Sequence, residues 1–145
     1  MGVLIPMRGA KPFAIVSGSS PVREPLDPPE WLSSDARDEW NRVAPILIEE
    51  RRTLTVTDIA SLANYCVAVG RAAEAERIIA RDGMIVTTKT GPKKHPAVAI
   101  SSDAMTQARL LAGELGLTPV SRSRPSVRSE GGGDHGPGLF DMDFG

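Results

Sequence analysis

The sequence is poor in the residues that support disulfide, metal and redox chemistry. Its 145 residues include a single cysteine, Cys66, and two histidines, His95 and His135, which lie in different segments. One cysteine cannot form an internal disulfide, and Cys66 falls within an apolar helical pattern that is typical of a buried thiol. No pair of histidine or cysteine residues has metal-ligand spacing. We therefore expect neither a metal ion nor any other cofactor.

The sequence also lacks a long apolar run. Near the N-terminus the apolar residues 3–5 are followed at once by Pro6, Arg8 and Lys11. The apolar run is therefore too short to be the core of a signal peptide or a membrane span. We therefore expect an intracellular, soluble protein that does not bind membranes.

A strongly basic balance is missing as well. The formal net charge is -1 and the isoelectric point is near 6.1, unlike most proteins that coat nucleic acid. Any contact with DNA must then come from local basic patches.

Catalytic patterns are not evident. The segment 90–94, Thr-Gly-Pro-Lys-Lys, lacks the Gly-Lys-Ser/Thr ending of a phosphate-binding loop and is better explained as a turn. Four carboxylates lie on predicted helix faces with bases nearby, where solvation is their expected role: Glu49, Glu50, Glu74 and Glu76. No nucleophile, base and orienting group can be placed together, so we do not expect an enzyme.

The pattern of apolar residues predicts a mainly α fold. We expect a small helical domain of three main helices with a short β-hairpin or irregular strand segment, flanked by disordered N- and C-terminal tails. The predicted division is a flexible arm over residues 1–27, a helical core domain over 28–120, and a disordered tail over 121–145 that ends in an acidic and aromatic peptide.

Helix boundaries in the first half are marked by capping residues. Ser33 or Ser34 can cap the first helix, and Pro45 inside that helix predicts a kink. Thr55 and Asp58 have the spacing of a capping box at the start of the second helix. That helix should end at Gly83 through a left-handed residue.

The second half reads as a hairpin followed by the third helix. Residues 84–88 and 93–95 are the expected strands. The expected turn, 90–94, lies between them and overlaps the start of the second strand. Helical spacing resumes after Pro96, and Gly116 followed by apolar Leu117 predicts a Schellman ending. Trp31 and Trp40 are both expected in the core, because aromatic residues at helical spacing usually pack inside. Stacking on nucleic-acid bases is the alternative for both.

Loop cations are the candidate DNA contacts. The hairpin carries Lys89, Lys93 and Lys94, and the loop between the first two helices carries Arg51 and Arg52. Simple solvation is the alternative for such clusters, but a hairpin tip has a shape that can enter a groove or line a channel. The N-terminal arm is a weaker candidate with three bases, Arg8, Lys11 and Arg23.

The end of the chain is a candidate partner-binding peptide. Large apolar residues alternate with acids there after a glycine-rich spacer: Leu139, Phe140, Met142 and Phe144. Exposed apolar side chains of this size favour docking to a partner. The alternative is that this segment folds back on its own domain.

An ordered set of residues resembles the small terminase subunits of tailed bacteriophages and prophages. The set spans residues 29–124 and comprises Pro29, Trp31-Leu32-Ser33, Ala36, Trp40, Pro45, Leu54-Thr55, Asp58, Tyr65-Cys66, Gly83, His95-Pro96, Glu114-Leu115-Gly116-Leu117-Thr118-Pro119 and Ser121-Arg122. Such proteins often have a glycine-containing turn between the first two helices, where this chain has Arg51-Arg52-Thr53.

The resemblance implies a non-catalytic helical protomer that assembles into a homo-oligomeric ring in the host cytoplasm. It implies double-stranded viral DNA and the large terminase subunit, an ATPase and nuclease, as partners. A thin core that oligomerisation completes is consistent with this. Two alternatives stay open: a phage or prophage regulator with a helix-turn-helix, and an adaptor with no nucleic-acid role.

Overall fold

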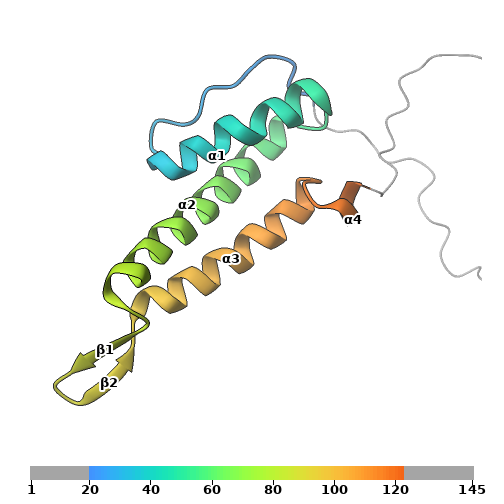
Figure 1. The fold of residues 1–145 in the computed structure, drawn as a ribbon. Helices are drawn as coiled ribbons and strands as arrows, with labels where there is room; N and C mark the ends of the chain where they lie inside the picture. Colours follow the sequence, from blue (N-terminus) through green and yellow to red (C-terminus); the bar gives the residue numbers. More distant parts are fainter. Residues whose placement is uncertain (1–19, 123–145) are drawn as a thin grey trace, which may run out of the picture. The chain divides into compact units, whose positions relative to one another are not determined.

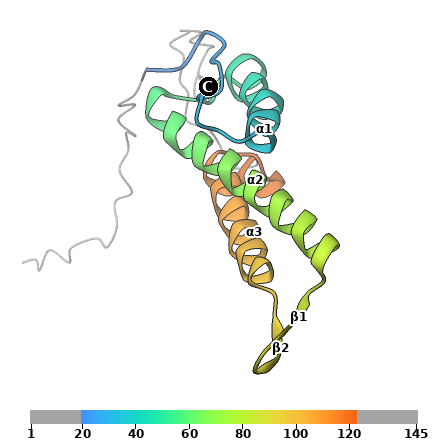
Figure 2. The same cartoon turned by 90° about the vertical axis from the view of Figure 1, so that its left-hand side faces the viewer.

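The computed structural model describes residues 20–122, which form a mainly helical domain as predicted (Figure 1). Two helices, α2 and α3, run side by side, and α1 crosses the N-terminal half of α2 (Figure 2). The elements in chain order are α1 Ser34–Pro45, the π-helix η1 Ile46–Glu50, the 3-10 turn η2 Val56–Asp58, α2 Ile59–Asp82, β1 Ile85–Thr88, β2 Gly91–Lys94, α3 Pro96–Glu114 and α4 Pro119–Arg122.

Helix α1 begins where its sequence predicts. The Ser33 hydroxyl accepts a hydrogen bond from the Ala36 amide at 3.4 Å, which satisfies one of the free donors of the first turn. Pro45 has no amide to bond back to Asn41, so regular α-helical bonding stops there. The chain stays helical beyond Pro45, where the sequence predicts a kink, but it does so as a π-helix, closed by a bond from the Arg51 amide to the Ile46 carbonyl at 2.9 Å.

The capping box at the start of the second helix is confirmed. The Thr55 amide donates to the Asp58 carboxylate at 3.1 Å, and a 3-10 turn then leads into α2. At the other end Gly83 has φ 85° and ψ 164°. The positive φ agrees with the prediction, but ψ is extended rather than left-handed helical, and the chain therefore passes directly from α2 into β1.

The core lies where α1, α2 and the preceding loop meet. Trp40 is 1% exposed, as predicted, and Cys66 is fully buried. Trp31 is 66% exposed, so its predicted place in the core is wrong. Gly70 allows α1 and α2 to approach closely. The buried cluster consists of Leu32, Ala36, Trp40, Val43, Ala44, Leu47, Ile48, Leu54, Leu62, Ala63, Tyr65 and Cys66.

The hairpin is an antiparallel pair whose turn differs from the prediction. Ile85 pairs with Lys94 and Thr88 pairs with Gly91, which leaves Lys89 and Thr90 as the two-residue turn. The second strand is therefore Gly91–Lys94 rather than 93–95. Gly91 has φ 110°, a conformation that suits glycine and lets the second strand start immediately after the turn.

Helix α3 has a histidine cap and the predicted Schellman ending. The Nδ1 atom of His95 accepts a hydrogen bond from the Ala97 amide at 3.0 Å. At the C-terminus the Leu117 amide donates to the Ala112 carbonyl at 2.8 Å, and Gly116 has φ 73°. Pro119 then starts the short helix α4 instead of only blocking continuation, so helical structure extends two residues past the expected boundary at residue 120.

Residues 20–27 are packed on the domain, although the sequence assigns them to a flexible arm. Pro21 and Thr55 form an isolated β-bridge, and the Val22 amide donates to the Leu54 carbonyl at 2.9 Å. Val22 and Leu26 pack against the core. The arm prediction fails here because its few apolar residues show no period, while the site they cover is formed by distant residues.

Candidate nucleic-acid interface

The hairpin carries three cations and no acid of its own. Lys89, Lys93 and Lys94 are all exposed, and between Gly83 and Ser102 the chain contains no carboxylate. Within the part of the chain that the structure describes, none of the three lysines has an ion-pair partner. Their charges are therefore available to an anion such as a phosphate group.

The three lysines do not form a flat patch. Because successive residues of a strand point to opposite faces, Lys93 shares a face with Val86, and Lys94 shares the other face with Ile85. Lys89 lies in the turn at the tip. Positive charge therefore surrounds the hairpin. This distribution suits a finger placed between two phosphate backbones better than a surface laid against one.

The base of the hairpin is held by a charged cluster. Arg81 donates to Asp82 at 2.7 Å and 2.9 Å, and the hydrogen bond from Arg81 holds the pKa of Asp82 below its usual value. The Nε2 atom of His95 lies 3.5 Å from the same carboxylate. The His95 amide also donates to the Met84 carbonyl at 2.8 Å. These contacts fix the direction in which the hairpin leaves α2 and α3.

The other predicted cations lie at the opposite end of α2 (Figure 1). Arg51 is half-buried, and its Nη1 donates to the Gly116 carbonyl at 2.9 Å, which joins the loop before α2 to the end of α3. Arg52 is exposed and has φ 52°. The 24 residues of α2 separate these arginines from the hairpin by about 36 Å, so the structure does not bring the two predicted sets together.

Most other arginines in the described region are bound to acids or carbonyls. Arg77 forms an ion pair with Asp35, and Arg42 donates to Glu39 at 2.8 Å. The same Glu39 accepts from the Tyr65 hydroxyl at 2.7 Å, and burial together with this bond raises the pKa of Tyr65 to about 12.

Burial likewise raises the pKa of the Cys66 thiol to about 12, which keeps it protonated and unreactive.

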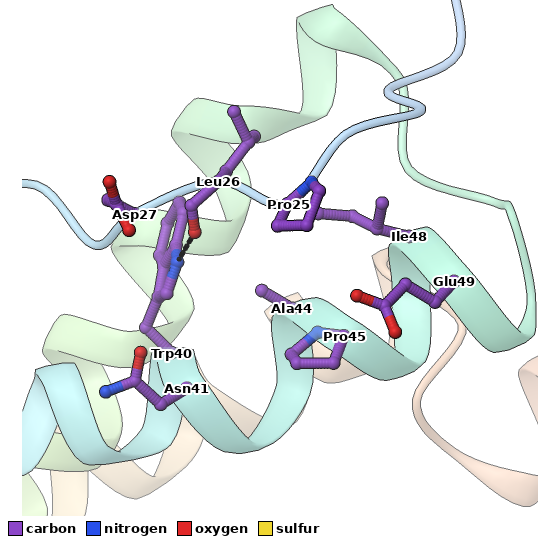
Figure 3. A pocket seen from close by; sticks show the side chains of 9 residues that line it. All are labelled: Pro25, Leu26, Asp27, Trp40, Asn41, Ala44, Pro45, Ile48 and Glu49. Atoms are coloured by element: carbon purple, nitrogen blue, oxygen red, sulfur yellow. Dashed lines mark hydrogen bonds between the residues drawn. The ribbon is translucent and has the colours of Figure 1, made fainter.

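A small pocket beside α1 is unsuited to phosphate. It has a volume of about 190 Å³ and lies where residues 25–27 cross α1 (Figure 3). The Trp40 indole donates to the Leu26 carbonyl at 2.9 Å across its floor. Its charged lining groups are Asp27 and Glu49, and no cation lines it. The pocket therefore repels anions and reflects imperfect packing of the crossing segment.

Sequence reasoning misses a larger groove between α2 and α3. The groove has a volume of about 630 Å³ and is lined by Trp31, Asn64, Val67, Ala68, Arg71, Ile100, Asp103, Ala104, Gln107 and Leu111. The only signal in the sequence is Trp31, which its spacing assigns to the core.

Other site types are not seen in the described residues. Between residues 20 and 122 no three of His, Cys, Asp and Glu gather in a way that could hold a metal ion. None of the helices there is both long enough and apolar enough to cross a bilayer. The predicted partner peptide, with Leu139, Phe140, Met142 and Phe144, lies outside the described residues.

The fold and the basic hairpin define a small helical protein with a candidate surface for polyanions. A family model for the phage terminase small subunit matches residues 36–131, about two thirds of the chain. The chain belongs to this family, as its resemblance indicated. Searches of curated proteins and of solved structures find no match.

Proposed function

We propose that this protein is the non-catalytic small subunit of a phage terminase, which forms a homo-oligomeric ring, engages double-stranded viral DNA and recruits or regulates the large ATPase and nuclease subunit to start genome packaging. Membership of the small-subunit family supports this role. The proposed location is the host cytoplasm.

The hairpin is the proposed DNA contact, and its three free lysines are the observation that carries this assignment. A protein with a net charge of -1 has no overall attraction for DNA. Repeating one small basic finger around a symmetric ring multiplies a weak contact through multivalency. Arg52 is a second proposed DNA contact. Arg51 is also proposed, although its Nη1 already donates to the Gly116 carbonyl.

Salt-dependent DNA binding tests this proposal. Lys89→Ala, Lys93→Ala and Lys94→Ala, combined in one chain, should weaken binding to double-stranded DNA and flatten its salt dependence. The slope of log K against log salt falls by roughly 0.9 for each phosphate that the protein no longer neutralises. The matched control is Arg71→Ala, Arg109→Ala and Arg122→Ala, which removes the same charge at exposed positions that are not proposed to contact DNA. Equal weakening in both variants would refute the hairpin assignment.

Native mass spectrometry separates the proposed role from its alternatives. A closed ring is expected, a stable dimer would favour a regulator, and a monomer without salt-sensitive DNA affinity would favour an adaptor. The arrangement of α1 and α2 disfavours the helix-turn-helix alternative. Residues 46–58 separate α1 from α2 instead of a tight turn, and α2 packs against both α1 and α3.

The peptide 139–144 is the proposed contact with the large subunit, through Leu139, Phe140, Met142 and Phe144. Phe140→Ser with Phe144→Ser should abolish co-purification of the large subunit and leave DNA affinity unchanged. Retained co-purification would place the contact elsewhere.

A further inference from the structure

The groove between α2 and α3 combines an apolar floor with a polar rim. Val67 and Leu111 are partly buried, and Ala68 and Ala104 are buried beneath them. At its edges Trp31 is 66% exposed and Ile100 is 52% exposed. Exposed apolar side chains as large as these two, lining one groove, favour binding of an apolar group.

The rim selects the kind of occupant. Arg71 is exposed and has no ion-pair partner among the described residues, while Asp103 provides one opposing carboxylate. DNA is a poor fit, because the floor is apolar and only one rim group, Arg71, can attract a phosphate backbone. A peptide with large apolar side chains and a few acids satisfies both the floor and Arg71.

The chain itself contains such a peptide. Residues 139–144 read Leu-Phe-Asp-Met-Asp-Phe, with four large apolar side chains and two acids. We propose that the groove between α2 and α3 binds this C-terminal peptide when no other partner holds it. In that bound state, apolar side chains of the peptide cover Trp31 and Ile100, and Asp141 or Asp143 pairs with Arg71.

The length of the connecting segment fits this arrangement. Residues 123–138 contain five glycines, three serines and two prolines, and a random coil of 16 residues with such a composition has a root-mean-square span of about 22 Å. The groove extends along α3 from Ile100 to Leu111, about 16 Å, and its near end lies 11 residues before Arg122. A tether of this length gives an effective concentration on the order of millimolar, so a weak contact suffices.

Quenching of a fluorophore by tryptophan tests the inference in the full-length protein. Gly145→Cys provides one reactive thiol, since Cys66 is buried and stays protonated. A bimane label there should be quenched by Trp31 on contact, and Trp31→Phe should remove the quenching. Trp40 is buried and cannot reach the label.

Charge reversal adds a readout that a general structural defect would not give. Arg71→Glu should release the label, and combining it with Asp141→Lys and Asp143→Lys should restore quenching. Phe140→Ser with Phe144→Ser supplies the unbound reference. Brightness equal to that reference in the parent protein, or quenching that survives Trp31→Phe or Arg71→Glu, would overturn the inference. Phe140→Ser with Phe144→Ser changes no charge and should leave DNA affinity unchanged, so this test and that of the hairpin fail independently.

Discussion

The Nη1 atom of Arg51 donates a hydrogen bond to the carbonyl oxygen of Gly116, 65 positions later in the chain, at 2.9 Å. Gly116 lies two residues after Glu114, the last residue of α3, and is the positive-φ residue of the Schellman ending. The contact joins the loop after η1 to the end of α3. Arg51 thus has a structural partner at a position where the sequence alone indicates a free cation.

Replacing Arg51 should lower stability more than it lowers DNA affinity. Arg51→Ala leaves a half-buried carbonyl without its charged donor, so the free energy of unfolding should fall by about 1.5–3 kcal/mol. Urea denaturation measures this, with Arg52→Ala as the control for loss of charge in the same loop. A variant that keeps its stability but loses DNA binding would show that Arg51 acts on DNA instead.

Arg52 should tolerate glycine better than a branched residue. Its φ of 52° lies in the left-handed region, which costs a residue with a Cβ atom roughly 1–2 kcal/mol. Arg52→Gly removes this cost but adds freedom to the unfolded chain, so stability should stay the same or rise slightly. Arg52→Val should be less stable than Arg52→Gly by about 1 kcal/mol or more in thermal or urea unfolding. Equal stability of the two variants would contradict the conformation assigned to Arg52.

Two helical glycines should respond to alanine in opposite ways. A Cβ atom at Gly70 would lie 3.1 Å from the backbone nitrogen of Ala36 and 3.1 Å from Oγ of Ser33, so Gly70→Ala should destabilise the domain by roughly 1–3 kcal/mol. At Gly113 nothing lies within 4 Å of that position. Gly113→Ala should therefore stabilise α3 by about 0.5–1 kcal/mol. Urea unfolding of both variants decides the sign, and a stabilising Gly70→Ala would mean that α1 and α2 do not cross there.

Tyr65 should titrate at unusually high pH, and its signal can be read directly because it is the only tyrosine. Burial and the bond to Glu39 raise its pKa from 10.0 to about 12. The unfolded chain therefore loses this proton first, and stability should decline as the pH rises above 10. Ultraviolet absorbance of the phenolate measures the midpoint. Glu39→Gln should lower that midpoint, and an unshifted midpoint in the parent protein would contradict the contact.

Local capping explains which parts of the fold could be predicted. Ser33, the pair Thr55 and Asp58, and Gly116 each set a helix end through bonds to residues three to five positions away. Spacing of this kind is visible in the sequence. Trp40 is likewise predictable, because its neighbours at helical spacing are apolar.

The predictions that failed depend on contacts between distant residues. Trp31 lines the groove between α2 and α3, so its place depends on how these distant helices pack. Residues 20–27 are held by hydrogen bonds from Val22 to Leu54 and from Trp40 to Leu26. The turn of the hairpin lies at Lys89 and Thr90 because strand register, rather than the position of Gly91 and Pro92, determines where the chain reverses. The bond from Arg51 to Gly116 has no local signal at all.

The hairpin has two outer edges, and they differ in their ability to accept another strand. The His95 amide bonds to the Met84 carbonyl, and Pro92 lies three residue pairs further along the hairpin. At that position the backbone amide of β2 would point away from β1, toward the outer edge. Proline has no amide hydrogen, so Pro92 cannot donate to a strand added there. Lys93 and Lys94 also lie on β2, and proline and lysine both discourage edge-to-edge association. Strand β1, Ile85–Thr88, has no charged residue and no proline. A strand from a neighbouring molecule that extended this sheet would therefore join β1.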